Sequence, residues 1–303
     1  MPSFTQVNLH KAEQATSLLA GGLQGKAKEQ NVLLITEPHL VAGKIAGMPR
    51  GTKTIAASIT PSKRTPGPRA GIVVTRDLQV QAMDSLCQRD CAVALARLHG
   101  REVLLISAYL DINLSPAPQC LADILNIAQR KKWPIILGID SNAHSSLYGP
   151  GENNKRGDEF EDFILRHDLR VENFGTAPTF ETRRADKIIS THIDVTLSRD
   201  LPFDIQDWRV SRDFNGSDHN TILFSSASAP PTSKYVRPWS KADWPLFTSS
   251  LSEADYQIPG NVTMKKLDRH VARLYSILNE AIDKACPLIS VTDRVPDLSL
   301  IHI

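Results

Sequence analysis

The sequence predicts an α+β fold in which two mixed β-sheets pack face to face with helices on their outer sides, a four-layer α/β/β/α sandwich. Short apolar and β-branched runs outnumber helical ones over residues 1–224, and several follow one another with no helix between them. A doubly wound parallel sheet needs a helix after nearly every strand, so this order favours mixed sheets. Polar residues also stand just past the ends of several apolar runs, where a sheet edge brings distant positions together.

Each expected strand is a short run with wholly apolar or alternating character, as is typical of buried and half-buried strands. Turn residues or charged residues bound most of these runs, and His99-Gly100 forms the turn between the two longest. The expected strands are 4–9, 32–36, 54–59, 71–75, 91–98, 102–110, 134–139, 188–197 and 221–224.

Three helices are expected among these strands. Residues 11–30 carry apolar side chains at helical spacing, which indicates an amphipathic helix. Pro116 opens a second helix that runs to about Lys131, because proline is favoured in the first turn. A third helix is expected over residues 158–167.

The composition changes near Ser225, which predicts a domain over residues 1–224 and a separate segment over 225–303. Residues 225–233 are rich in serine, proline and alanine and are typical of a linker. A helix with one apolar face is expected over 264–285. The remainder of the segment is expected to be partly disordered.

Composition excludes several classes of protein. Of the 303 residues, 41% are hydrophobic and 22% are charged, which is ordinary for a globular chain. The formal charge of +2 is too small for a protein that coats nucleic acid, so any polyanion must meet a local basic patch or a metal ion. Neither a membrane span nor a secretory signal is evident, so we expect an intracellular protein with no membrane association.

Acidic and amide residues at strand ends are the first candidate site residues. Glu37 ends the apolar run 32–36, where an acid is unusual without a partner, although a solvated strand end is an equally good interpretation. Asp140 and Asn142 follow another apolar run two residues apart, so both can face one pocket, and Gly138 allows close approach. The alternative is an Asx turn that closes the strand.

Three further candidates lie later in the chain. Asp194 stands inside an apolar run and would need a buried cation or histidine as partner. Asp218 and His219 precede the last strand of the domain and could equally form a turn.

Together and in this order, short blocks covering most of residues 1–224 resemble the endonuclease/exonuclease/phosphatase superfamily, whose fold is the DNase-I-like sandwich. The blocks are Gln6-Val7-Asn8, Thr36-Glu37-Pro38, Ser107-Ala108-Tyr109, Gly138 to Asn142, Thr179-Phe180, Ile193-Asp194 and Ser217-Asp218-His219.

A finer resemblance is to the endonuclease domain of non-LTR retrotransposon polyproteins. Residues 140–144 (DSNAH) with 147–149 (LYG) are similar to their D-x-N-A-H…LWG segment, with Tyr148 in place of the usual tryptophan. Residues 237–244 and 281–287 resemble the connector between endonuclease and reverse transcriptase. The resemblance therefore implies a reverse-transcriptase domain in the full-length polyprotein.

The resemblance implies a divalent metal ion, with Mg²⁺ expected and Mn²⁺ as an alternative. Glu37 would be its main ligand, supported by Asn8, and Asp218 would add to the metal shell. Carboxylate and amide oxygens suit such a hard cation. His144 is also a metal-ligand candidate, but a hydrogen bond that shapes its loop is the preferred interpretation.

It also implies the catalytic roles. Asp140 would orient and deprotonate the attacking water, while Asn142 and Tyr109 would donate hydrogen bonds to phosphate oxygens. His219 would contact the scissile phosphate and be oriented by Asp194. Either Asp140 or His219 could be the general base.

Double-stranded DNA is the expected partner, and two basic loops are expected to contact it. Arg183, Arg184 and Lys187 would crown a hairpin, which enters the minor groove in the retrotransposon relatives. Lys63 and Arg64, with Arg69, form the second loop. The alternative for both loops is solvated surface.

The function implied is a Mg²⁺-dependent endonuclease that nicks one DNA strand and leaves a 3′-hydroxyl primer for reverse transcription, in the nucleus. The alternatives are another phosphoesterase of the same fold, such as an apurinic-site endonuclease, a phosphoinositide phosphatase or a sphingomyelinase, and a decayed domain that binds DNA without cutting it. His10 stands where apurinic-site enzymes carry an acid, which weakens the repair alternative.

Overall fold

The structure is a computed structural model that describes residues 1–26, 29–59, 67–75, 77–185, 187–227, 234–236, 242–254, 256, 264–286 and 289–291. The chain forms two compact units, Met1–Ala229 and Pro230–Ile303. Within these described residues, no helix is long and apolar enough to cross a membrane.

The first sheet has six strands in the order β15-β16-β1-β2-β6-β5. It is mixed, because β1 runs parallel to β2 and antiparallel to β16. Its strands are β1 (Ser3–Asn8), β2 (Asn31–Thr36), β5 (Thr52–Ile55), β6 (Ala70–Thr75), β15 (Asp204–Ser211) and β16 (Thr221–Ala227).

The second sheet also has six strands, in the order β11-β14-β10-β9-β8-β7. It too is mixed, because β10 runs parallel to β9 and antiparallel to β14. Its strands are β7 (Val80–Ala82), β8 (Cys91–Leu98), β9 (Arg101–Tyr109), β10 (Ile135–Asp140), β11 (Arg170–Val171) and β14 (Asp194–Arg199). The predicted pair of mixed sheets is confirmed.

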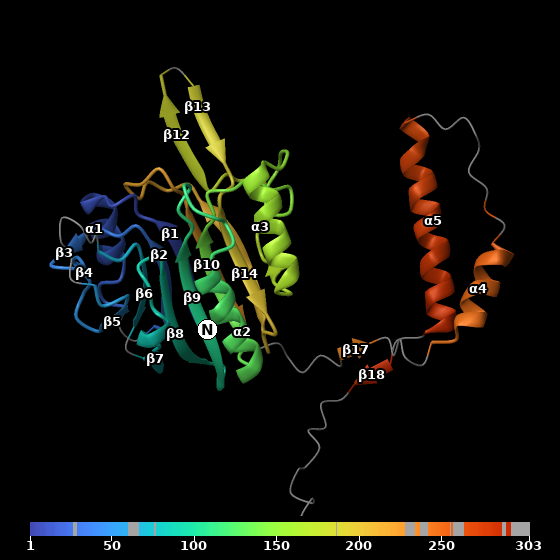
Figure 1. The fold of residues 1–303 in the computed structure, drawn as a ribbon, viewed down its shortest axis with the longest axis horizontal. Coiled ribbons are helices and arrows are strands. Elements are labelled where there is room, and N and C mark those ends of the chain that lie inside the picture. Colours follow the sequence, from blue (N-terminus) through green and yellow to red (C-terminus); the bar gives the residue numbers. More distant parts are fainter. Residues whose placement is uncertain are drawn as a thin grey trace, which may run out of the picture. The chain divides into compact units, whose positions relative to one another are not determined.

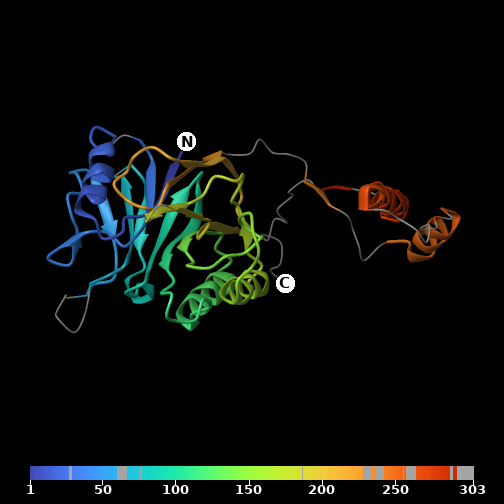
Figure 2. The ribbon, with the colours of Figure 1, turned by 90° about the horizontal axis from the view of Figure 1, so that it is seen from above.

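Helices cover the outer face of each sheet, as Figures 1 and 2 show. Helix α1 (Glu13–Gly22) packs on the first sheet through a cluster that includes Ala15 and Leu33. Helices α2 (Gln119–Lys131) and α3 (Lys155–Arg166) pack on the second sheet. Between the sheets, a third cluster joins side chains such as Phe4 and Leu105, so burial of apolar surface holds all four layers together.

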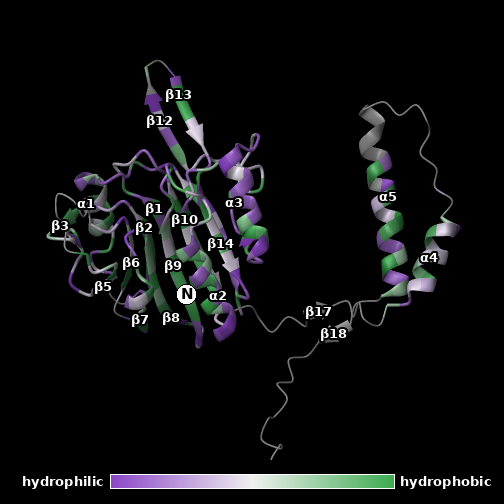
Figure 3. Cartoon of the chain, in the orientation of Figure 1, coloured by the Kyte–Doolittle hydropathy of each residue, from purple (hydrophilic) through white to green (hydrophobic). Residues whose placement is uncertain are grey.

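A two-stranded hairpin projects from this sandwich in Figure 1. Its strands are β12 (Phe180–Arg184) and β13 (Lys187–Thr191), and they pair with each other in antiparallel register. Figure 3 colours β12 mainly as hydrophilic, with a short apolar part on β13. The predicted hairpin is therefore present. A second small hairpin joins β3 (Leu40–Val41) and β4 (Lys44–Ile45), and a 3₁₀ turn covers Asp84–Leu86.

Several element boundaries differ from those predicted. Pro116 does not open α2, which begins at Gln119 after Pro118 as N-cap, α3 begins at Lys155 instead of residue 158, and β5 spans Thr52–Ile55 instead of 54–59. The helix expected over 11–30 ends at Gly22, because consecutive glycines disfavour helix and Gly25 has a positive φ of 77°. The single strand expected over 188–197 is two strands, β13 and β14, which belong to different sheets. Apolar character alone cannot show where a chain leaves one sheet for another.

The second unit contains helices α4 (Trp244–Glu253) and α5 (Met264–Ala285) and a pair of strands, β17 (Lys234–Val236) and β18 (Ile289–Val291). The prediction of a helix over 264–285 is confirmed by α5. Asp243 caps α4 by accepting a hydrogen bond from the Leu246 N–H at 2.9 Å. Strand β16 of the first unit includes residues 225–227, and the identification of residues 225–303 as linker and connector stays a prediction.

Candidate active site

Ends of neighbouring strands from both sheets converge on one edge of the sandwich. Asn8 ends β1, and Glu37 follows the last residue of β2, with β1 and β2 parallel. In the second sheet, Asp140 at the end of β10 is in register with Tyr109 on β9 and with Asp194 on β14. The folding of the sheets therefore brings together residues that are far apart in sequence.

Asn8 connects the acidic residues of the two sheets. Its Nδ2 donates to Asp140 Oδ2 at 2.7 Å and, in a longer contact of 3.4 Å, to Glu37 Oε2. Its Oδ1 accepts a hydrogen bond from the His10 backbone N–H at 2.7 Å. Asn8 is buried, so this amide holds two carboxylates in place between the sheets.

Glu37 is presented from an unusual backbone conformation. Its φ of 44° lies in the left-handed region, and its N–H donates to the Arg69 carbonyl at 2.7 Å. The carboxylate Oε1 lies 2.8 Å from Lys11 Nζ, and 12% of the side chain is exposed. The carboxylate can thus be reached from solvent, although its backbone is fixed.

Asp194 and His219 form a buried ion pair, with Nδ1 of the imidazole 2.8 Å from the carboxylate Oδ2. The Phe180 ring packs edge-on against the imidazole, with 4.9 Å between centroids. Burial lowers the pKa of His219, but the charge and hydrogen bond of Asp194 outweigh it and raise this pKa to about 9. His219 is therefore protonated near neutral pH, and Nδ1–H donates to Asp194.

Asp140 is buried beside this pair. Burial raises its pKa above the ordinary value, the Asp194 carboxylate raises it further, and the His219 charge and the Asn8 hydrogen bond act in the opposite direction. Ligand atoms of Asp140, Asp194 and His219 all lie within 4.8 Å of one another, so this cluster could hold a metal ion. A protonated His219, however, offers no lone pair to a cation.

Asp218 lies at the margin of the cluster. Its Oδ1 is 3.1 Å from His10 Nδ1, and 23% of its side chain is exposed. The neighbouring Ser217 Oγ donates to the Asn8 carbonyl at 2.8 Å, which attaches this loop to β1. Of the predicted metal ligands, Asn8 thus contacts Glu37 directly, whereas Asp218 is linked to Asn8 through His10 and Ser217.

Asn142 and Tyr109 border Asp140. Asn142 adopts a positive φ of 48°, its N–H donates to Asp140 Oδ1 at 3.2 Å, and its Nδ2 donates to the Leu110 carbonyl at 3.1 Å. Burial raises the pKa of Tyr109 to about 12, and the charges of Glu37 and Asp140 also raise it. The Tyr109 hydroxyl consequently keeps its proton and can act as a donor.

Gln6 and Gly138, which lie below the site, fix the distance between the sheets. Gln6 is buried, its Nε2 donates to the Val195 carbonyl at 3.2 Å, and its Oε1 accepts from Thr196 Oγ1 at 2.8 Å. A Cβ on Gly138 would meet Leu34 Cδ1 at 2.8 Å and Gln6 at 3.0 Å. The close approach that the sequence predicts at Gly138 is therefore a contact between the backbone of β10 and side chains of the other sheet.

The predicted DNA-binding residues of the hairpin lie apart from the acidic cluster in sequence and belong to a different sheet. Arg183 and Arg184 are on β12 and Lys187 begins β13; the Arg183 and Lys187 side chains are exposed. Lys63 and Arg64 lie outside the described residues.

The interpretation of Arg69 as part of a basic surface loop is wrong. Its side chain is buried and forms ion pairs with Asp90 and Asp111. Neither this role nor the ion pair of Lys11 with Glu37 was predicted, because each depends on residues that the fold alone brings together. In the sequence, Arg69 stands in Arg-Ala-Gly ahead of an apolar run, and these neighbours do not indicate which residues its side chain contacts.

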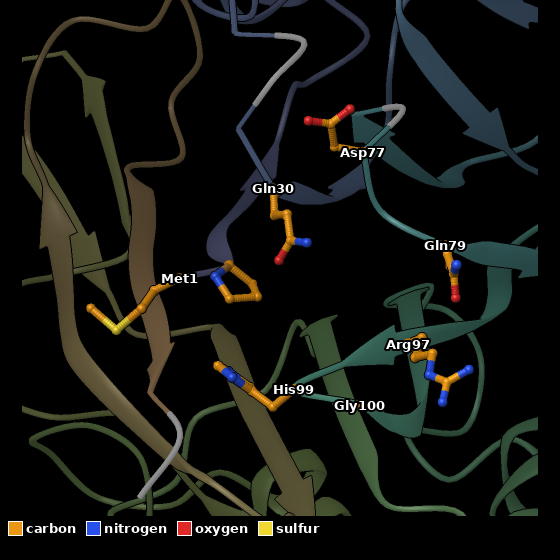
Figure 4. A pocket seen from close by; sticks show the side chains of 8 residues that line it. Met1, Gln30, Asp77, Gln79, Arg97, His99 and Gly100 are labelled. Atoms are coloured by element: carbon orange, nitrogen blue, oxygen red, sulfur yellow. The ribbon is translucent and has the colours of Figure 1, made fainter.

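The other end of the same strands holds a pocket of about 560 Å³ (Figure 4). It is lined by Met1, Pro2, Gln30, Asp77, Gln79, Arg97, His99 and Gly100. Met1 and Gln30 precede β1 and β2, whereas Asn8 and Glu37 stand at the opposite ends of these strands. The pocket is therefore separate from the converging carboxylates.

Comparisons with known proteins agree with this geometry. Residues 103–223 match the family model of endonuclease-reverse transcriptase. The structure is similar to the endonuclease domain of TRAS1, a telomere-specific non-LTR retrotransposon, with a TM-score of 0.63 and 27% identity over 76% of this chain and 100% of that chain. The sequence is 26% identical over 306 residues to a 115 kDa protein in the type-1 retrotransposable element R1DM of Drosophila melanogaster.

That alignment covers 94% of this chain, and the chain spans 28% of the length of the Drosophila protein. More distant structures share the fold alone. One is AP endonuclease LMAP from Leishmania major, with a TM-score of 0.54 and 12% identity over 73% of this chain and 86% of that chain.

Two facing mixed sheets, with an Asp–His pair and further carboxylates at their common edge, make the chain similar to the endonuclease/exonuclease/phosphatase superfamily. Within that superfamily, its similarity is to endonuclease domains of the retrotransposon type.

Proposed function

We propose that this domain hydrolyses one strand of double-stranded DNA with the help of Mg²⁺, and leaves a 3′-hydroxyl that primes reverse transcription. The observation that carries the proposal is the buried His219–Asp194 pair beside Asp140, which Asn8 connects to Glu37. The names of the relatives, a retrotransposon endonuclease and a retrotransposable-element protein, support DNA as the substrate and a polymerase domain elsewhere in the full-length protein.

Glu37 is the residue best suited to hold the metal ion. Its carboxylate is partly exposed, and its ion-pair partner within the described part of the chain is the exposed Lys11, whose side chain can move away. Asn8 and Asp218 offer further oxygens, and Mg²⁺ prefers oxygen ligands. Ligation by His219 is disfavoured because its raised pKa keeps the ring protonated on both nitrogens, which leaves no lone pair for a cation. A bound Mg²⁺ would neutralise phosphate charge and stabilise the leaving oxygen.

Asp140 is the group we assign as general base. Burial and the Asp194 charge raise its pKa, which brings it closer to the working pH and makes it a better proton acceptor. His219 already carries its proton and would instead donate a hydrogen bond to a phosphate oxygen. Tyr109 would add a second hydrogen bond from a hydroxyl that remains protonated. Asn142 would keep the Asp140 carboxylate oriented through its backbone N–H.

The hairpin β12–β13 would contact the duplex next to the scissile bond. Phe180 at its base packs on His219, so the strand that enters the hairpin touches the reactive site directly. Arg183, Arg184 and Lys187 supply positive charge near its turn, where phosphates or the edge of a groove would lie.

Conversion of supercoiled plasmid to nicked circles, with and without EDTA, tests the proposal. We expect nicks only with Mg²⁺ or Mn²⁺ present, and ends that a DNA polymerase extends without further treatment. Ends that a polymerase extends only after phosphatase treatment would contradict the 3′-hydroxyl. Release of phosphate from inositol phosphates, with intact plasmid, would favour a phosphatase of the same fold.

A further inference from the structure

Arg69 is a buried cation between the two sheets. It directly precedes β6 of the first sheet, and 7% of its surface is exposed. Its Nε and Nη2 donate to the two oxygens of Asp90 at 2.6 Å each, and its Nη1 donates to Asp111 Oδ2 at 2.7 Å. Asp90 directly precedes β8 and Asp111 follows β9, so both acids belong to the second sheet.

The same residue touches two of the proposed site residues. Its guanidinium carbon lies 4.4 Å from the centre of the Tyr109 ring, within the range of a cation–π contact. Its carbonyl accepts the hydrogen bond from the Glu37 N–H, at the residue with the positive φ. In addition, the Tyr109 N–H donates to the Asp90 carbonyl at 2.9 Å. Glu37 and Tyr109 are therefore connected through a single arginine and its carboxylate partner.

We infer that Arg69 is a positioning residue that fixes the Glu37 carboxylate relative to the Tyr109 hydroxyl across the gap between the sheets. This inference rests on the proposed nuclease function. The guanidinium fork and a carboxylate form two parallel hydrogen bonds, and this geometry defines orientation as well as distance. On the other flank of the site, the His219–Asp194 pair also crosses from the first sheet to the second. The Arg69 ion pairs and the His219–Asp194 pair thus both connect the first sheet to the second.

Arg199 provides a matched control for the effect of removing a buried arginine. It stands at the far end of β14 from Asp194, is 6% exposed, and donates to the carbonyls of His167 and Leu125 at 2.9 Å each. Its replacement should destabilise the domain without touching the site. Any effect particular to Arg69 must exceed the effect of this control.

The test compares Arg69→Met, Arg69→Lys and Arg199→Met in the full chain, with rates corrected for the folded fraction. We expect Arg69→Met to lower kcat about 100-fold and to raise the Mg²⁺ concentration needed for half-maximal rate, with little change in KM for DNA, because a small misplacement of catalytic groups costs that much. Arg69→Lys keeps the charge without the fork and should recover part of kcat. Arg199→Met should keep the wild-type kcat.

Two kinetic outcomes would overturn the inference. In the first, Arg69→Met and Arg199→Met both have the wild-type kcat after correction for the folded fraction. The other is a raised KM for DNA with unchanged kcat, which would make Arg69 a binding group.

Amide hydrogen exchange gives a readout that needs no activity. In Arg69→Met, the N–H groups of Glu37 and Tyr109 should exchange at least about tenfold faster than in Arg199→Met. Both amides donate hydrogen bonds next to Arg69, so their exchange reports on local opening around this residue. Unchanged exchange at these two amides would overturn the inference even if nicking fell. If the wild type nicked no DNA, the proposed function would fail, while the exchange data would still show whether Arg69 fixes the two residues.

Discussion

The proton on His219 is held by the Asp194 carboxylate, and this has a consequence for stability. The pKa of His219 is raised from 6.5 to about 9 in the folded protein. A raised pKa means that the folded state binds the proton more tightly than the unfolded state does. The resulting stability is complete below pH 6.5 and is lost as the pH rises towards 9.

This linkage predicts a pH-dependent effect of His219→Gln. The difference in unfolding free energy between wild type and variant should shrink by about 3 kcal/mol between pH 6 and pH 10, the equivalent of the shift in pKa. Urea unfolding at several pH values measures it, and a difference independent of pH would contradict the protonated pair.

The metal assignment predicts the behaviour of Glu37→Gln. The variant keeps the shape of the side chain but loses the charge that would hold Mg²⁺, so nicking should fall roughly 10³-fold while the fold stays intact. Plasmid nicking and circular dichroism provide the two measurements. Wild-type rates in the variant, or in EDTA, would contradict the assignment.

Asp140→Ala separates catalysis from binding. Loss of the general base should lower the rate roughly 10²- to 10⁴-fold. DNA affinity should stay close to wild type, because the proposal assigns most phosphate contacts to basic residues away from Asp140. A binding titration at fixed salt concentration decides the matter, since a parallel loss of affinity would make Asp140 a binding residue.

At the scale of elements, the strands themselves could be predicted more reliably than the neighbours with which they pair in a sheet. The apolar run at 134–139 and the helix at 264–285 carry strong local signals, and both are present as β10 and α5. Strand β15 was not predicted, because alternating charged and apolar residues on a half-exposed edge give no clear run. The site residues of each block could be named from the resemblance, whereas the ion pairs of Arg69 depend on the packing of both sheets.

We expect the hairpin β12–β13 to influence which positions on DNA are cut. If its turn reads the minor groove, Arg183 and Arg184 influence where the chain is cut more than how fast any one bond breaks. Replacement of both arginines by alanine should flatten the pattern of nicks along a plasmid and reduce the salt dependence of binding by about two counterions. Primer extension maps the nicks, and an identical pattern with identical salt dependence would show that this hairpin is plain solvated surface.

For the whole chain, the first unit holds the complete set of described site residues. The three apolar clusters draw their members from between Phe4 and Phe224. We therefore expect a fragment of residues 1–229 to fold alone and to nick DNA at the rate of the full chain. Thermal unfolding and plasmid nicking of the two proteins test this, and a fragment that fails to fold would show that residues 230–303 stabilise the sandwich.

The first sheet places the beginning and the end of this unit side by side, since β1 pairs with β16. While a ribosome synthesises the chain, Asn8 and Glu37 emerge early, but His219 and the strand that closes the sheet emerge last. A nascent chain that lacks β16 thus has neither the complete first sheet nor the histidine. The proposed site can therefore assemble only after the chain has been synthesised through β16.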